Sequence, residues 1–243
     1  MKLLHIDSSI SGAESASRRI SAAVVGRFKD EHPGLEITYR DVAAEPLPHH
    51  SEAILRLKAA SAARSSNAES DTDTDTDTDA DTDAGSGSGT DLDAGARTLG
   101  ELSRLDEALE EFLAADVVVI GAPMYNFGIP SQLKSWIDAL AVFGKTFHYT
   151  QDGPEGLAGG KRVIVASSRG GEYVADTPTA SFDHQETYLT SFFAFLGVRN
   201  LEFVRAEGIN YGPEQRKLAI DAALAEAVAL KAVRGAQPGA GPR

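Results

Sequence analysis

Residues 116–138 read DVVVIGAPMYNFGIPSQLKSWID and carry the strongest structural signal in the chain. Val117–Ile120 are four consecutive β-branched residues, a pattern typical of a strand buried on both faces. The segment Met124–Gly128 follows a Gly-Ala-Pro break, and helical spacing of apolar residues then restarts at Leu133. This succession predicts a ligand crevice at the carboxyl edge of an α/β sheet. The aromatic residues Tyr125 and Phe127 would alternatively serve only to pack the strand end.

The composition is that of an ordinary globular protein. Of the 243 residues 42% are hydrophobic and none is cysteine, which excludes disulfides and a cysteine nucleophile. No run approaches the roughly 18 apolar residues of a membrane span, and a strand pattern begins at Leu3, so we expect neither a span nor a signal peptide. We therefore expect a cytoplasmic protein with one domain over residues 1–233 and a flexible tail over 234–243.

Residues 65–95 form an acidic segment of Asp, Thr, Gly and Ser. They carry ten acids and no Lys or Arg, so the rest of the chain has a net charge of only −3 rather than −13. Such a segment buries nothing, and we expect a disordered insertion. It lacks the spacing of a calcium-binding loop, so we expect no metal site. The mildly acidic remainder does not favour nucleic-acid binding.

Short apolar runs separated by helical patterns predict a doubly wound, five-stranded parallel sheet with helices on both faces. The five predicted strands are Lys2–Ile6, Leu35–Arg40, Val117–Ile120, Lys161–Ala166 and Leu201–Val204. Five strands favour the flavodoxin-like order 2-1-3-4-5 over the dinucleotide-binding order. We expect Ser17 to cap the first helix, a loop-rich excursion over Phe143–Leu157 and helices over His184–Leu196 and Glu214–Val233.

In this order the loops after the first, third and fourth strands converge on one crevice. The first loop leads into a helix N-terminus, where free N–H groups and the helix dipole favour an anion. It lacks both the G-x-G-x-x-G and the P-loop patterns, and its hydroxyls (Ser9, Ser15 and Ser17) suit a single terminal phosphate. The alternative is that these serines act only as caps and turn formers.

The other two loops are suited to a flat heterocycle. Tyr125 and Phe127 supply aromatic faces, Asn126 supplies an amide, and Gly170 and Gly171 allow close backbone approach. A phosphate at one end and a planar polar ring at the other describe FMN. A receiver domain of the same strand order would need an Asp at the end of the third strand, where this chain has Gly121-Ala122-Pro123.

Several long motifs resemble one enzyme family. APMYNFGIPSQLKSWID, TFHYTQDGPEGL, SRGG and HQETYL…FLG…AEGINYGPE are similar to motifs of the FMN-dependent NADH-azoreductases, also described as NADH:quinone oxidoreductases. The resemblance implies a flavodoxin-like fold with non-covalent FMN and NADH, or alternatively NADPH, as electron donor. It also implies two-electron, ping-pong reduction of quinones and aromatic azo compounds, and a homodimer with its active sites at the interface.

The same resemblance implies which residues bind FMN. The phosphate falls on Ser9, Ser15, Ala16 and Ser17. The ring lies between two segments, which are Met124, Tyr125, Asn126 and Phe127 on one side and Ser168, Arg169, Gly170 and Gly171 on the other. No catalytic side chain is implied, because the flavin N5 carries the hydride.

Several further roles stay open. Tyr173 falls where some relatives have a histidine, and His148, Tyr149 and His184 are candidate proton or substrate contacts. The alternative function is a flavodoxin-type electron carrier without a small-molecule acceptor of its own. The Phe143–Leu157 excursion and the aromatic helix at His184–Leu196 are more than a carrier needs, which favours the enzyme.

Overall fold

The computed structural model describes residues 1–68 and 89–233. The chain forms two compact units, of which the first comprises Met1–Leu47 with Ala108–Arg243 and the second comprises Pro48–Glu107. We expected a single domain with an insertion, whereas residues 48–107 form a unit of their own. The first unit contains the parallel sheet and the candidate site.

The sheet has five parallel strands in the order β2-β1-β3-β6-β7. Their bounds are β1 (Lys2–Asp7), β2 (Glu36–Asp41), β3 (Val117–Pro123), β6 (Arg162–Ser168) and β7 (Asn200–Ala206). Because β4 and β5 lie outside this sheet, the order is the predicted 2-1-3-4-5, and the flavodoxin-like architecture is confirmed. All seven residues of β3 are buried, in agreement with its uninterrupted β-branched run.

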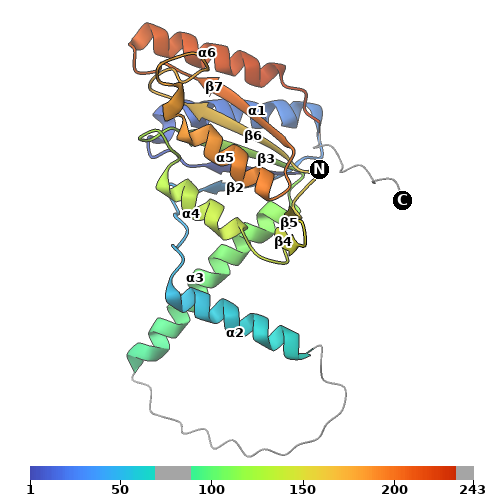
Figure 1. The fold of residues 1–243 in the computed structure, drawn as a ribbon. Helices are drawn as coiled ribbons and strands as arrows, with labels where there is room; N and C mark the ends of the chain where they lie inside the picture. The colour runs from blue at the N-terminus through green and yellow to red at the C-terminus, as the bar shows by residue number, and fades with distance from the viewer. Residues whose placement is uncertain (69–88, 234–243) are drawn as a thin grey trace, which may run out of the picture. The chain divides into compact units, whose positions relative to one another are not determined.

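Helices cover both faces of the sheet (Figure 1). On one face α1 (Ala16–Glu31) and α6 (Pro213–Ala229) pack their apolar residues against β1, β3, β6 and β7. On the other face lie α4 (Ser131–Leu140) and α5 (His184–Phe195), joined by the last turns of α3 (Gly89–Ala114). There the Phe112 ring contacts the rings of Trp136 and Phe193 at centroid distances of 6.2 and 6.4 Å.

The strand register brings the carboxyl ends of four strands to one edge of the sheet. Asp7 at the end of β1 lies opposite Gly121, and Ser168 at the end of β6 lies opposite both Pro123 and Ala206. The loops after β1, β3, β6 and β7 therefore begin side by side, as the edge rule for α/β sheets predicts.

The first loop contains the 3-10 turn η1 (Gly12–Glu14) and ends at Ser15, which caps α1. Our prediction that Ser17 is the cap is wrong, because the Ser15 Oγ accepts the hydrogen bond from the Arg18 backbone N–H. The helix ends at Glu31, and His32 is its C-cap.

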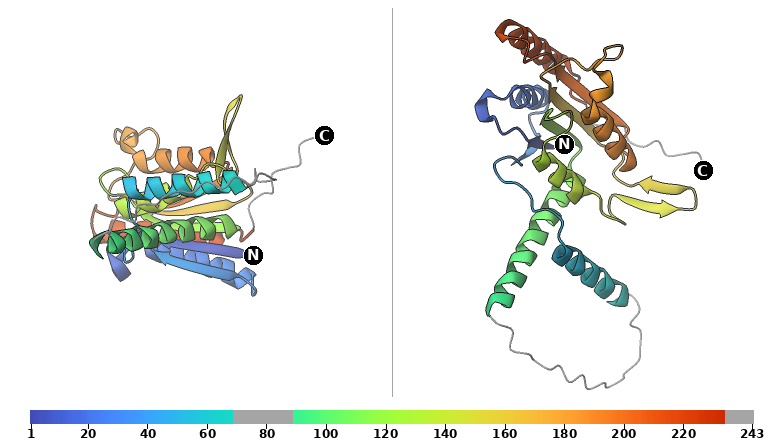
Figure 2. Two further views of the ribbon diagram at one scale, coloured as in Figure 1. Left: turned by 90° about the horizontal axis from the view of Figure 1, so that it is seen from below. Right: turned by 60° about the vertical axis from the view of Figure 1, so that its left-hand side comes forward.

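An antiparallel hairpin occupies part of the predicted loop excursion. It pairs β4 (Phe147–Thr150) with β5 (Gly153–Gly156) and projects as a separate ribbon in Figure 2. The hairpin meets the end of α5 at a contact between two glycines, since a Cβ on Gly156 would lie 2.1 Å from the Gly197 nitrogen. The short turn η2 (Ala180–Phe182) precedes α5.

The second unit contains α2 (Glu52–Ala68) and the larger part of α3. Ser51 Oγ accepts a hydrogen bond from the Ile54 N–H at 3.3 Å, and the Ile54 side chain is buried. Within the predicted insertion over 65–95, residues 65–68 and 89–95 are helical. Its remainder and the tail over 234–243 lie outside the described residues. None of the described helices is long and apolar enough to cross a membrane.

Candidate functional site

A hollow of about 270 Å³ lies at the edge where the four strands end. Seven of its lining residues belong to the predicted set, namely Ser9, Ser15, Ala16, Met124, Tyr125, Ser168 and Gly170. Six others were not predicted, namely Ser11, Glu14, Pro123, Ile209, Asn210 and Arg216. The three predicted loops therefore meet, and the loop after β7 completes the hollow with α6.

The serine end of the hollow is the start of α1. The Ser15 Oγ lies 3.0 Å from the Ser17 Oγ, and both side chains are almost fully buried. Ser9 is also buried, and its Oγ accepts a hydrogen bond from the Ser11 N–H at 3.2 Å. The first backbone N–H groups of a helix have no partner within it, so this end presents hydroxyl and amide donors together.

Arg18 fixes the loop after β1, residues 8–15, which we call the serine loop. Its Nε and Nη2 donate to the Ser9 carbonyl at 3.2 and 2.7 Å, and its two terminal nitrogens donate to the Asp41 carboxylate at 2.7 and 2.8 Å. The hydrogen bond to Asp41 raises the pKa of the Arg18 guanidinium. Burial is the largest influence on Asp41 and opposes its ionisation. The hydrogen bonds from Arg18 and from the Ala43 and Ala44 N–H groups, together with the Arg18 charge, outweigh burial and lower the pKa of that carboxyl.

Asp7, the last residue of β1, lies in this same buried polar cluster. Its carboxylate accepts hydrogen bonds from the Ser21 and Tyr39 hydroxyls at 2.9 and 3.2 Å. A Cβ at position 121 would lie 2.3 Å from the Asp7 Oδ1, which explains why β3 has Gly121 beside it. Desolvation, followed by the charges of Asp7 and Asp41, raises the pKa of Tyr39.

The loop after β3 is a two-residue reverse turn. The backbone N–H and C=O groups of Tyr125 and Gly128 bond each other at 2.9 and 3.0 Å. The two central residues have positive φ, at 47° for Asn126 and 71° for Phe127, which is the geometry of a type I′ turn. A bulky aromatic residue at positive φ is unusual, and such strain occurs mainly at functional sites.

This turn points its aromatic side chains in two directions. The Tyr125 hydroxyl faces the serine loop, while Phe127 is 44% exposed at the outer rim. The Phe127 ring lies 5.2 Å from that of Phe182 and 6.2 Å from that of Tyr173. Asn126 and Phe127 do not line the hollow of about 270 Å³, although they directly follow Tyr125, which does.

The loop after β6 is fixed by its neighbours on both sides. The Ser168 carbonyl accepts a hydrogen bond from the Met124 N–H at 2.8 Å, and the Gly170 carbonyl accepts one from the Asn210 N–H at 3.1 Å. A Cβ on Gly170 would lie 2.5 Å from the Asn210 Nδ2, so a larger residue at this position would displace the Asn210 side chain. Gly171 accepts from the Gly208 N–H and lies behind this contact.

Arg169 belongs to the predicted set, but its side chain points away from the hollow. The almost fully buried guanidinium forms ion pairs with Asp183, Glu186 and Glu207. Glu207 also accepts a hydrogen bond from the Tyr173 N–H at 3.0 Å, and the Asp183 side chain caps α5. Arg169 therefore holds three segments around the hollow together and does not line it.

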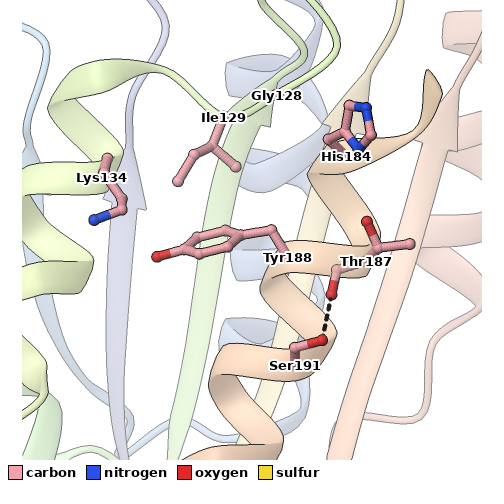
Figure 3. A pocket seen from close by; sticks show the side chains of 7 residues that line it. All are labelled: Gly128, Ile129, Lys134, His184, Thr187, Tyr188 and Ser191. Carbon is pink, nitrogen blue, oxygen red and sulfur yellow. Dashed lines mark hydrogen bonds between the residues drawn. The ribbon is translucent and has the colours of Figure 1, made fainter.

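A second, more open hollow of about 530 Å³ lies between α4 and α5, directly after the turn (Figure 3). It is lined by Gly128, Ile129, Lys134, His184, Thr187, Tyr188 and Ser191. In Figure 3 the Tyr188 ring extends across it toward α4. Burial, together with the charge of Asp138, raises the pKa of Tyr188 to about 12, so its hydroxyl stays protonated at neutral pH.

The two other candidate contacts lie on the β4–β5 hairpin. His148 Nε2 lies 2.9 Å from the Glu155 carboxylate on the opposite strand, and Tyr149 is 68% exposed. Neither residue lines the hollow of about 270 Å³. His184 begins α5, and its backbone N–H donates to the Phe127 carbonyl at 3.1 Å.

The hollow offers what FMN requires. Hydroxyl and amide donors gather at one end, and at the other Met124, Tyr125 and Gly170 line a slot between two loops. The hydrogen-bond donors at the first end suit a phosphate. The backbone around Gly170 leaves room for a planar polar ring at the second end, and the two ends together fit FMN. This site at the carboxyl edge of a sheet ordered β2-β1-β3-β6-β7 defines a flavodoxin-like protein.

Comparison with known proteins narrows the class to a family. The profile of the flavodoxin-like fold matches residues 1–230. An FMN-dependent NADH:quinone oxidoreductase of Rhizobium meliloti (strain 1021) is 49% identical over 234 residues, which cover 95% of this chain and 98% of that protein. A protein named FMN-dependent NADH:quinone oxidoreductase 2, from Bradyrhizobium diazoefficiens, is also 49% identical, over 96% of this chain and all of its own length. This chain belongs to the family of FMN-dependent NADH:quinone oxidoreductases.

The fold is also that of a solved azoreductase. The crystal structure of azoreductase from Bacillus anthracis str. Sterne superposes with a TM-score of 0.73 and 28% sequence identity. The alignment covers 94% of this chain and 97% of that one. The family resemblance expected from the sequence motifs is thereby confirmed.

Proposed function

We propose that this protein uses FMN to transfer two electrons from NADH to quinones and aromatic azo compounds. The observation that carries the proposal is the hollow in which the serine loop, the Tyr125 turn and the Ser168–Gly171 loop meet. The names of the relatives support FMN, NADH and quinone as reactants, and the likeness to an azoreductase supports the azo compounds.

Different segments of the chain would bind the phosphate and the ring of FMN. The hydroxyls of Ser9, Ser15 and Ser17, with the backbone at Ala16, would hold the phosphate at the start of α1. The segments Met124–Phe127 and Ser168–Gly171 would flank the ring. Within the second segment, Gly170 and Gly171 would contribute through the backbone, while the Arg169 guanidinium holds the loop from behind.

Bound FMN would supply the redox chemistry by accepting hydride from NADH and passing two electrons to the acceptor. The protein therefore needs no acid–base triad and contributes position and access. Phe127, half-exposed at the rim, limits access to the slot together with Phe182. A ping-pong order requires this opening to admit NADH and then the acceptor in turn, which an open rim allows.

We also propose a homodimer with the active site at the subunit interface. The turn after β3 and the turn η2 expose two apolar rings that contact each other, Phe127 at 44% and Phe182 at 46%. Neighbouring exposed apolar residues are typical of interaction surfaces. Because NADH is an intracellular reductant, we place the activity in the cytoplasm. The oligomeric state is measured by light scattering of the purified protein.

The activity is tested by mixing the purified, flavin-loaded protein with NADH and a soluble quinone. Rapid catalytic loss of NADH absorbance, with reduction of many equivalents of quinone, supports the enzyme. Bound FMN without turnover would instead indicate the alternative, a flavodoxin-type electron carrier. Repeating the assay with NADPH and with an azo dye sets the donor preference and the acceptor range.

The location of the site is tested separately with the double variant Ser15→Ala, Ser17→Ala. We expect weaker FMN binding with an unchanged far-UV circular dichroism spectrum, because both hydroxyls are lost from the phosphate end while the fold is kept. A Ser103→Ala variant, at an exposed position of α3, serves as the matched control. Unaltered FMN affinity in the double variant would remove the serine loop from the site.

A further inference from the structure

We infer that Arg216 is the cation that binds the FMN phosphate, an inference that rests on the proposed function. Arg216 lies in the first turns of α6 and lines the hollow. It is separated from the serine loop by about two hundred residues of sequence, yet its Nη2 donates to the Glu14 carbonyl at 3.0 Å. Glu14 directly precedes Ser15, and Arg216 lines the same hollow as Ser9 and Ser15.

The charges around the hollow single out this residue. Arg216 is the single Lys or Arg among the described residues that line it. Arg18, which also approaches the serine loop, is already neutralised by its two-bond contact with Asp41. A phosphate monoester carries nearly two negative charges at neutral pH. The serine hydroxyls and the helix N-terminus donate hydrogen bonds to such a group, and Arg216 would add a positive charge that offsets part of its negative charge.

The bonding of Arg216 leaves it available for an anion. Within residues 1–68 and 89–233 its side chain makes one hydrogen bond, to a backbone carbonyl, and forms no ion pair with a carboxylate. The guanidinium carries five N–H donors, and one of them is used at Glu14. The remaining donors suit a phosphate, which guanidinium binds through two parallel hydrogen bonds.

The bond to Glu14 gives Arg216 a positioning role as well. It ties the beginning of α6 to η1, so the loop after β1 is bonded at Glu14 by Arg216 as well as at Ser9 by Arg18. A purely structural role and a phosphate-binding role make different predictions. The structural role would affect any flavin, whereas the phosphate role affects only flavins that carry the phosphate.

The test compares FMN with riboflavin, which has the same ring and no phosphate. The full chain is freed of flavin and titrated with each, with flavin fluorescence as the readout. We expect Arg216→Gln to weaken FMN binding about tenfold or more, as loss of a charged hydrogen bond does, and to leave riboflavin binding unchanged. Arg216→Lys should restore part of the FMN affinity. Lys217→Gln is the matched control, because Lys217 is exposed and pairs with Asp221 on α6.

Unchanged FMN affinity in Arg216→Gln, or an equal loss for FMN and riboflavin, would overturn the inference and leave the proposed function standing. If the wild-type chain binds neither flavin, the proposed function itself fails. Raising the salt concentration gives a second readout. The FMN affinity of the wild type should fall more steeply with salt than that of Arg216→Gln, since a charge pair is screened.

Discussion

The Tyr125 hydroxyl lies 3.5 Å from the Ser9 Oγ and accepts a hydrogen bond from the Ile10 N–H at 3.2 Å. One side chain thus ties the turn after β3 to the serine loop after β1. The phosphate end and the ring end of the candidate site are held in register by this contact.

Removing the hydroxyl with Tyr125→Phe should therefore weaken FMN binding while keeping the fold. A neutral hydrogen bond contributes about 0.5–1.5 kcal/mol, so we expect FMN affinity to fall by a factor of about 3 to 10. Titration by flavin fluorescence measures it. Tyr149→Phe, on the exposed hairpin, is the control and should bind as the wild type does. Equal affinities of the Tyr125 variant and the wild type would show that the contact is dispensable.

Positive φ at Asn126 makes the turn sensitive to the residue that occupies it. We expect Asn126→Gly to be nearly neutral in stability, whereas Asn126→Val should lower the free energy of unfolding by about 1–2 kcal/mol. Urea unfolding of both variants measures the difference. Because Asn126 is exposed, lost packing does not explain such a difference. Two equally stable variants would contradict the left-handed conformation.

Arg169 is the common partner of three largely buried carboxylates. Arg169→Gln leaves Asp183, Glu186 and Glu207 without that partner, and we expect a loss of about 3–5 kcal/mol in the free energy of unfolding. Arg205→Gln is the matched control, since Arg205 is 43% exposed by side chain and shares only Glu186. Its loss should stay below about 1 kcal/mol. Thermal unfolding of the two variants measures this difference in stability. Similar melting temperatures would contradict the prediction that Arg169 stabilises the fold more than Arg205 does.

The pair of Arg18 and Asp41 should make stability depend on pH in the acid range. The pKa of Asp41 in the folded chain lies below its ordinary value of 3.8, so the unfolded chain binds the proton more readily. The stabilisation is present in full above that ordinary value and is lost as the pH falls through the lower folded value. Asp41→Asn should cost about 1 kcal/mol or less at neutral pH, because the pair is partly exposed to solvent.

Urea unfolding of the wild type and Asp41→Asn at a series of pH values checks this dependence. The difference between them should be constant near neutrality and should shrink below the ordinary pKa of aspartate. Asp221→Asn, in an exposed pair with Lys217, controls for general effects of removing an acid. A difference that does not change with pH would contradict the assignment to the Asp41 charge.

The sheet could be predicted from the sequence because burial on two faces leaves continuous apolar runs such as Val117–Ile120. The β4–β5 hairpin could not, since β5 reads Gly-Pro-Glu-Gly and has no apolar alternation. Its position depends instead on the contact of Gly156 with Gly197, which lies 41 residues further along the chain. The cap at Ser15 was missed because Ser15 and Ser17 lie two positions apart and either side chain can cap a helix.

In the candidate site, too, features encoded in continuous sequence could be predicted, whereas those that depend on contacts between distant segments could not. Motifs that are continuous in sequence predicted the serine loop, the Tyr125 turn and the Ser168–Gly171 loop. The direction of the Arg169 side chain was not predictable, because it depends on acids contributed by α5 and by the loop after β7. Asn210 and Arg216 were missed for a related reason. The AEGINYGPE motif marked their neighbourhood, but only the fold brings Arg216 to Glu14.

Because four strand ends converge on one hollow, the stability of the chain depends on whether a ligand occupies that hollow. A ligand that touches the loops after β1, β3, β6 and β7 binds the folded chain and not the unfolded one, and at a hundredfold excess over its Kd such a ligand adds about 2.7 kcal/mol to stability. The supply of flavin would then set how long newly made chains survive proteolysis, so enzyme abundance would follow the cofactor pool.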